Sequence, residues 1–162
     1  MHSRKQGALN EFCIRMNNQF QQQVFSNEWH KLRVNLLYTG SWLRGEVAGF
    51  LKPFGITQQQ FNILSILRDN HPKALSTQQL RDRLVDRMSD TSRLVDRLQQ
   101  KKLVCKEECS QDKRLVDINI TENGMQLLCQ IDAEMPQLDE VLQTLTEKEA
   151  TFLNKLLERL HR

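Results

Sequence analysis

Apolar residues recur three or four positions apart along most of this chain, which is the spacing that places them on one face of a helix. The first such run follows Ser26, which we expect to cap its helix, and stops at Pro53 and Gly55. Its apolar positions are Trp29, Leu32, Leu36, Leu43, Val47 and Phe50. The pattern therefore predicts one long helix within residues 26–54.

Three further helices are indicated by capping boxes, in which a hydroxyl residue and a Gln or Glu three positions later satisfy free backbone donors reciprocally. These boxes are Thr57-Gln58-Gln59-Gln60, Ser76-Thr77-Gln78-Gln79 and Thr146-Glu147-Lys148-Glu149, and apolar residues at helical spacing follow each. Another helix is predicted to begin near Ser89, with Leu94, Val95 and Leu98 on its inner face.

The period changes after Leu103. Residues 104–108 and 115–120 are short runs with β-branched side chains, and a polar link joins them, so they predict a β-hairpin. Thr121 then precedes another helical pattern, in which Pro136 is expected to cause a kink or a restart. A long helix, three short helices, a hairpin and two more helices make a mainly α fold with a small β-hairpin wing. This order is that of the winged helix-turn-helix.

Composition excludes several other classes of protein. The chain has 162 residues, 39% of them apolar and 27% charged, which is ordinary for a soluble globular domain. No stretch approaches the roughly 20 apolar residues that cross a bilayer, and the basic start lacks the apolar run of a secretory signal. We therefore expect a cytoplasmic protein without a membrane partner.

The candidate chemistry is sparse. The four cysteines form no C-x-x-C pair and are expected to be free thiols, and the four histidines are dispersed, so neither a metal nor a cofactor is expected. The cysteines are Cys13, Cys105, Cys109 and Cys129. A Ser/His/Asp set, a phosphate loop and an acidic metal cluster are all missing at a useful spacing, so an enzyme is the weakest interpretation.

Charge is distributed unevenly along the chain. Residues 1–54 carry seven basic and three acidic side chains, and residues 55–121 carry 12 basic and nine acidic ones. Residues 122–162 carry four basic and eight acidic side chains, so this acidic tail lowers the net charge to +3. The balance indicates that only part of the molecule faces a polyanion.

Two stretches resemble the MarR family of bacterial regulators. The first is S-T-Q-Q-L-R-D-R-L-V-D-R-M-S-D-T-S-R-L-V-D-R-L-Q-Q-K-K-L-V and the second is S-Q-D-K-R-L-V-D-I-N-I-T-E-N-G. They match the family's recognition helix, its D-x-R wing and its L-T-x-x-G start of the next helix. Lys102 departs from the pattern, because the family usually has glycine there, so Lys102 either strains that turn or changes it.

The resemblance implies that the protein regulates transcription by binding double-stranded DNA. The start of the recognition helix would enter the major groove, the wing would reach the minor groove, and Asp112 would brace Arg114. The implied DNA-binding residues are Ser76, Thr77, Gln78, Ser89, Asp90, Thr91, Ser92, Arg93, Arg97, Lys113 and Arg114. For the segment 89–93 and for residues 76–78, helix capping alone is the alternative.

The outer helices have apolar faces that three short helices and a hairpin cannot cover. We expect them to pack against a second copy, as in the family, giving a homodimer on a pseudo-palindromic operator. The expected divisions are an N-terminal extension (1–25), an N-terminal dimerisation helix (26–54), the winged helix-turn-helix (55–121) and C-terminal dimerisation helices (122–162). The family also implies a small-molecule effector that releases the DNA, and a repressor is the favoured mode.

Two alternatives remain open. A winged helix used only to join protein subunits would show no salt-dependent DNA affinity and no effect of changing Arg114. A cysteine-based redox sensor would depend on Cys13 or Cys109, although Cys13 lies too far before the first long helix to match the family's sensing cysteine.

Overall fold

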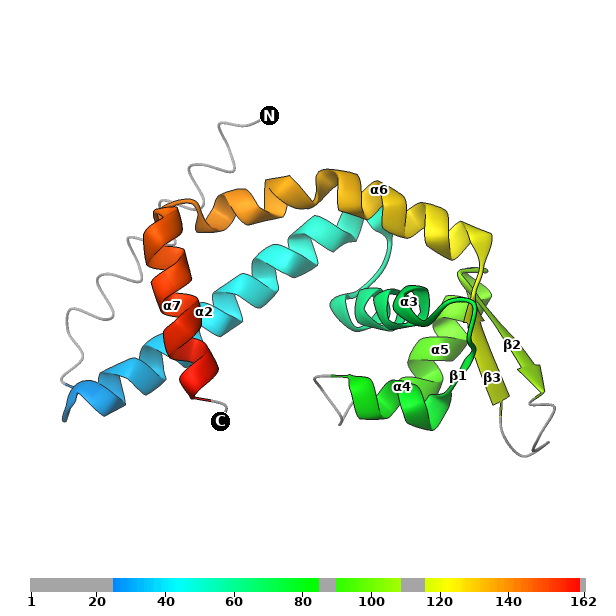
Figure 1. Ribbon diagram of the computed structural model, residues 1–162, viewed down its shortest axis with the longest axis horizontal. Helices are drawn as coiled ribbons and strands as arrows, with labels where there is room; N and C mark the ends of the chain where they lie inside the picture. The colour runs from blue at the N-terminus through cyan, green and yellow to red at the C-terminus, as the bar shows by residue number, and fades with distance from the viewer. Residues whose placement is uncertain (1–24, 85–89, 109–115, 161–162) are drawn as a thin grey trace. The chain divides into compact units, whose positions relative to one another are not determined.

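The computed structural model describes residues 25–84, 90–108 and 116–160 (Figure 1). The chain divides into two compact units, Met1–Trp42 and Leu43–Arg162, and helix α2 (Glu28–Leu51) runs through the boundary. The remaining elements all lie in the second unit. They are η1 (Lys52–Phe54), α3 (Gln58–Asn70), β1 (Leu75–Ser76), α4 (Thr77–Arg83), α5 (Thr91–Gln100), β2 (Val104–Glu108), β3 (Val116–Ile120), α6 (Glu122–Asp139), η2 (Glu140–Leu142) and α7 (Glu147–Arg159).

Helix α2 begins one residue later than a Ser26 cap would place it. The side-chain oxygen of Asn27 accepts the backbone N–H of His30 at 2.8 Å, while the Ser26 hydroxyl contacts the ring Nδ1 of His30 at 3.0 Å. The prediction that Ser26 caps this helix is therefore wrong, because the amide of Asn27 reaches the free donor instead. The predicted stop is confirmed, since Gly55 closes the turn after η1 with a φ of 69°.

The predicted hairpin is confirmed, and it belongs to a three-stranded antiparallel sheet in the order β1-β3-β2. Val104 pairs with Ile120 and Glu108 with Val116 across β2 and β3, and β1 adds Leu75 opposite Ile118. The two-residue strand β1 was not predicted. It exists through its pairing with β3, which lies some 40 residues further along the chain.

The core of the second unit joins every layer of the winged helix-turn-helix. Helix α3 packs against α5, α6 and β3, and its Ile63, Leu64 and Leu67 are buried. The other buried apolar residues come from the end of α2, the short helices α4 and α5, the sheet, α6 and the turns between these elements: Leu51, Ile56, Leu75, Leu80, Leu84, Val95, Leu98, Leu103, Val104, Ile118, Ile120, Leu128 and Ile131. The predicted mainly α fold with a small β wing is confirmed.

Helix α5 ends in a tight turn that also starts β2. The N–H of Lys102 bonds to the carbonyl of Gln99 at 2.8 Å, and the N–H of Leu103 bonds to that of Leu98 at 3.0 Å. These two bonds are those of a Schellman motif, which places its C′ residue in the left-handed region. Lys102 occupies that position with a φ of 60°, so the turn is kept and Lys102 carries its strain.

The same turn also holds the start of α6. Thr121 donates its hydroxyl to the carbonyl of Lys102 at 2.8 Å and its N–H to the carbonyl of Leu103 at 3.0 Å, and its hydroxyl accepts the N–H of Gly124. A Cβ on Gly124 would lie 2.4 Å from the carbonyl oxygen of Leu103 and 2.7 Å from Ile120. Gly124 is therefore required by this close approach of two backbones.

The sequence predictions for the last two helices, α6 and α7, have different outcomes. Helix α6 continues through Pro136 to Asp139, so the expected restart at Pro136 does not occur. Helix α7 starts with the predicted capping box, in which Glu149 accepts the backbone N–H of Thr146 at 2.8 Å. This hydrogen bond lowers the pKa of the exposed Glu149 carboxyl, so the cap is lost only as pH falls through that lowered value.

Among the described residues, no helix is long and apolar enough to cross a membrane.

We predict that Gly124→Ala destabilises the fold by about 1 to 3 kcal/mol, because the new methyl group must displace the backbone of Leu103. Chemical denaturation of both proteins measures the change in the free energy of unfolding.

Gly49→Ala is the matched control. A Cβ at this position in α2 meets nothing within 4 Å, and alanine favours a helix interior over glycine by about 1 kcal/mol. This variant should be as stable as the parent or more so. Equal stability of the Gly124→Ala variant and the parent would contradict the close approach.

Candidate nucleic-acid interface

Helices α4 and α5 pack against each other and form the helix-turn-helix. Helix α5 has two faces. Thr91, Val95 and Leu98 are buried against the core, while the opposite face is exposed. The exposed side chains are Ser92, Arg93, Asp96, Arg97, Gln99 and Gln100. A helix anchored on one side and polar on the other is suited to enter a DNA groove.

Thr91 does not lie on the exposed face. Its exposed fraction is 3%, because it is the first helical residue and falls in line with Val95 and Leu98. The DNA contact predicted at Thr91 stays a prediction, although the structure places this side chain inward. The spacing of four residues from Thr91 to Val95 could have revealed this.

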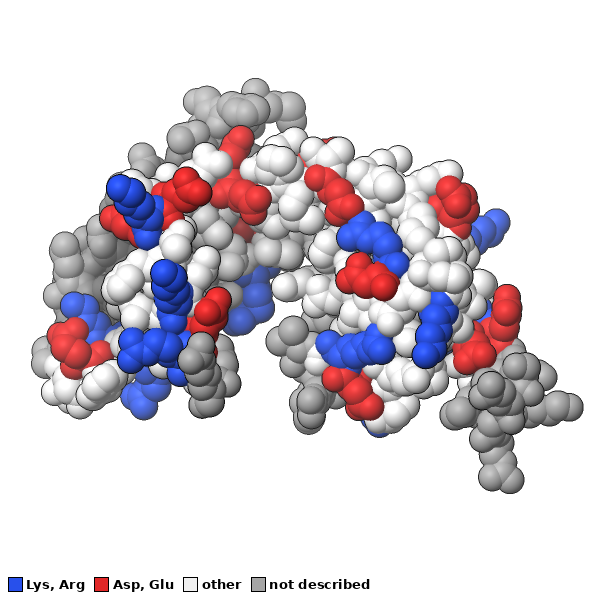
Figure 2. Space-filling view, in the orientation of Figure 1, with Lys and Arg blue, Asp and Glu red and all other residues white. Residues whose placement is uncertain are grey.

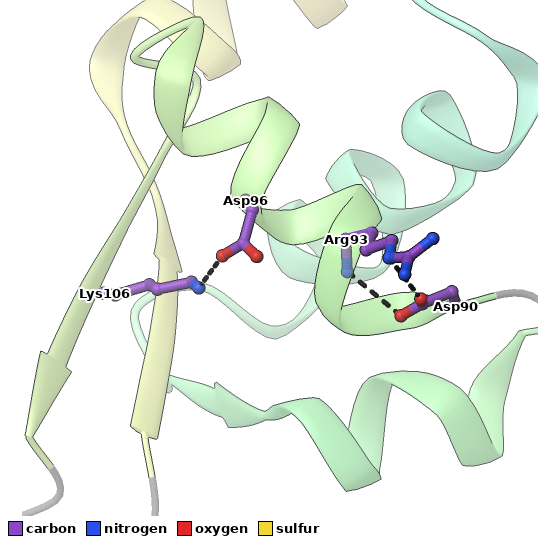
Figure 3. A network of polar contacts seen from close by, with 4 residues as sticks. All are labelled: Asp90, Arg93, Asp96 and Lys106. Carbon is purple, nitrogen blue, oxygen red and sulfur yellow. Dashed lines mark hydrogen bonds and ion pairs between the residues drawn. The ribbon is translucent and has the colours of Figure 1, made fainter.

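Asp90 caps α5. Its Oδ1 accepts the backbone N–H of Arg93 at 3.2 Å, and its Oδ2 pairs with Nε of Arg93 at 3.0 Å (Figure 3). The side chains of Asp90 and Arg93 remain 55% and 80% exposed. The capping alternative thus holds for Asp90, and the same carboxylate also orients the arginine beside it.

The start of α4 is a capping box. Ser76 and Gln79 exchange bonds between side chain and backbone at 2.9 and 3.2 Å. Gln78 is exposed, and its amide group lies between Asp82 and Arg81 on the same helix, while Thr77 is half-buried. Local roles therefore account for Ser76 and Gln78, and a DNA contact at residues 76–78 stays a prediction.

An ion pair that the sequence did not reveal joins the recognition helix to the wing. Asp96, on the exposed face of α5, pairs with Nζ of Lys106 on β2 (Figure 3). Such a pair at the surface contributes about 0–1 kcal/mol to stability. Its main effect is therefore on the orientation of the wing relative to α5. Its two residues lie ten positions apart on different elements, and only the folded hairpin brings them together.

A groove of about 790 Å³ opens beside the C-terminal half of α5. Lys52, Arg97 and Lys101 line it, and its lining contains no carboxylate. Nζ of Lys101 donates to the carbonyl of Gly55 and lies 3.4 Å from the side-chain oxygen of Gln60. Arg97, which is predicted to contact DNA, therefore also lines a cationic groove. The sequence did not reveal this groove.

Ser89, Asp112, Lys113 and Arg114 lie outside the described residues, so their predicted contacts stay predictions. On the face shown in Figure 2, basic and acidic side chains are intermingled.

Two of the four cysteines can be placed. Cys105 is half-buried with its Sγ 3.8 Å from the carbonyl oxygen of Asn119, and Cys129 is exposed on α6. Cys13 and Cys109, on which redox sensing would depend, lie outside the described residues. Within the described ranges, no group of three His, Cys, Asp or Glu side chains could hold a metal ion.

The chain is similar to known regulators in sequence. Residues 54–115 match the sequence model of the MarR family. The HTH-type transcriptional regulator MhqR of Bacillus subtilis is 28% identical over 107 residues, which cover 65% of this chain and 72% of MhqR.

Solved structures are similar in fold. A MarR transcription factor from Planctomyces limnophilus is 29% identical with a TM-score of 0.66, covering 83% of this chain and 98% of that one. A mutant MarR from E. coli, solved with operator DNA, is 24% identical with a TM-score of 0.74, covering 85% of this chain and 99% of that one.

Proposed function

We propose that this chain is a transcriptional regulator of the MarR family, to whose members it is similar, and that it binds a pseudo-palindromic operator as a homodimer and represses transcription. The family was predicted from the motifs of residues 76–124. The carrying observation is the two-faced helix α5, whose buried side fixes the direction in which Ser92, Arg93 and Arg97 project. Binding to chromosomal DNA would place the protein in the cytoplasm.

The proposed contacts divide into those that read bases and those that hold the backbone. Ser92 and Arg93 lie in the first turn of α5, the part of a recognition helix that reaches base edges. Arg97 lies one turn further on, where a phosphate contact is expected. From the sequence we add Ser76, Thr77, Gln78 and Ser89 as contacts near α4 and α5, and Lys113 and Arg114, braced by Asp112, at the wing.

We propose repression because a dimer that covers two half-sites excludes other proteins from the same DNA. The relatives solved with DNA support this mode of binding, since a mutant MarR from E. coli and MepR of S. aureus were both captured in DNA complexes. In a transcription assay on its own upstream DNA, added protein should lower the yield of transcript.

We expect the protein to bind its own upstream DNA more tightly than a scrambled duplex, with affinity that falls as salt rises. Arg93→Ala should cost about 1–3 kcal/mol on the specific duplex, and Arg97→Ala should reduce the slope of log K against log salt by about 1. Fluorescence anisotropy at several salt concentrations measures both quantities.

Lys155→Ala on α7 is the control, because it removes an exposed cation outside the helix-turn-helix. It should leave the slope unchanged. Affinity that is equal on both duplexes and insensitive to Arg93→Ala and Arg97→Ala would instead favour a winged helix that joins protein subunits.

The homodimer is proposed because two helices expose large apolar side chains. Trp29 and Leu37 on α2 are 79% and 68% exposed, and Phe152 on α7 and Leu160, directly after α7, are 64% and 56% exposed. Exposed apolar surface of this kind marks an interaction site, and the dimers of this family supply a second copy as its partner.

Phe152→Glu should weaken the dimer by about 1.5–3 kcal/mol, because the lost burial of one aromatic side chain is of that size. The dissociation constant would rise by about ten- to hundredfold, which analytical ultracentrifugation can follow across protein concentrations. Asn154→Glu adds the same charge to the same helix and should leave the dimer intact. A wild-type protein that sediments as a monomer at all concentrations would refute the proposal.

A small organic anion is the proposed effector class, because the groove beside α5 holds three cations and no carboxylate. An occupant that draws Lys101 from the carbonyl of Gly55 would remove a contact that ties the recognition helix to the turn after η1. A ligand that binds better to this altered state must weaken DNA binding.

Benzoate serves as the probe. It should raise the dissociation constant for upstream DNA, and Lys52→Ala should reduce this effect while leaving affinity without benzoate unchanged. Calorimetry that detects no benzoate binding, or an equal effect of benzoate on the Lys52→Ala variant, would rule out this groove for such anions.

A further inference from the structure

Arg93 is held at two points by one carboxylate. Oδ1 of Asp90 fixes its backbone N–H at 3.2 Å, and Oδ2 of Asp90 fixes its Nε at 3.0 Å (Figure 3). Because the cap sets where α5 begins, the guanidinium is positioned relative to the helix axis as well as relative to Asp90. Surface ion pairs add little to stability, so the main effect of this arrangement is to orient the guanidinium of Arg93.

The atoms that Asp90 occupies decide what Arg93 can still bind. With Nε engaged, the two terminal nitrogens, Nη1 and Nη2, remain, and no other ion pair with a described residue involves them. These terminal nitrogens form a planar fork that matches N7 and O6 of guanine in the major groove. The side chain is 80% exposed, so the fork is accessible.

The carboxylate has a second effect on binding. DNA phosphates repel it, so any pose in which the start of α5 rests on the backbone is disfavoured. A pose in which Nη1 and Nη2 of Arg93 meet a guanine keeps the pair with Asp90 intact, because that pair uses Nε. The pair therefore weakens binding in poses in which Arg93 does not meet its guanine. Such a loss increases specificity without raising affinity.

We propose that Asp90 is the positioning residue that makes Arg93 specific for one guanine in each half-site of the operator. This inference rests on the proposed function, and it adds to it the base that is read and the residue that selects it. Asp90 acts through Arg93 and need not touch the DNA itself.

Asp90→Ser separates the two roles of Asp90. Serine is also a strong N-cap, so α5 keeps its first turn while the ion pair is lost. The assay is fluorescence anisotropy on the upstream DNA, on a scrambled duplex, and on duplexes in which each guanine of the bound site is replaced in turn. Replacement of the guanine read by Arg93 should cost the wild type about ten- to hundredfold in affinity.

For Asp90→Ser we expect tighter binding to the scrambled duplex, weaker discrimination against the replaced guanine, and an unchanged melting temperature. In the Arg93→Ala background, Asp90→Ser should no longer change discrimination at that guanine. Asp82→Ser removes another exposed carboxylate of the helix-turn-helix and is the control. It should leave the preference for guanine intact.

Unchanged discrimination by Asp90→Ser would overturn this inference alone, since the wild type would still be a specific binder. An equal loss on all duplexes with a lower melting temperature would also overturn it, by showing that Asp90 only caps α5. Wild-type protein that binds every duplex equally would overturn the proposed function and this inference together.

Discussion

The position of the recognition helix depends on the backbone junction at its C-terminal end. There the turn at Lys102 directs the chain into β2, the hydroxyl of Thr121 bonds back to the carbonyl of Lys102, and Gly124 allows α6 to approach Leu103. Helix α5, the wing and α6 thus meet within one set of backbone contacts. A shift of any one of them must move the other two. The exposed face of α5 is therefore held in position by the protein itself, without a ligand.

The N-terminal end of α5 is held in a different way. Its first turn is fixed by the Asp90 cap and by burial of Thr91. Its exposed side chains are in contact with solvent and are therefore accessible to DNA. The helix therefore combines a rigid end that sets its direction with an accessible end whose chemistry can vary, as expected of a scaffold that serves many operators.

Local chemistry explains what the sequence could predict. Capping boxes at Thr57, Ser76 and Thr146 depend on residues three positions apart, and each is present in the structure. Features that depend on tertiary contacts were missed. Strand β1 needs β3, the Asp96–Lys106 pair needs the folded hairpin, and the cationic groove combines residues from α2, η1, α3 and α5.

The differences between prediction and structure have the same origin. Ser26 and Asn27 are both good caps, and only the helix start decides between them. Thr91 carries a hydroxyl of the kind expected at a DNA contact, yet its register places it inward. Pro136 removes one backbone donor, but a long helix can tolerate this loss where neighbouring bonds hold it. Residue type predicted chemistry at these positions, and register decided whether that chemistry is used.

The contacts between elements indicate how an effector signal could reach DNA. Arg68 on α3 pairs with Asp132 on α6 at 2.5 Å, and Lys101 at the end of α5 bonds to the carbonyl of Gly55 after η1. One contact links α3 to α6, and the other links the recognition helix to the turn after η1. Because both are charge-assisted and exposed, they can be exchanged for ligand or solvent at little cost. The apolar core beneath them cannot, so a ligand would reorient α5 as a rigid body instead of unfolding it.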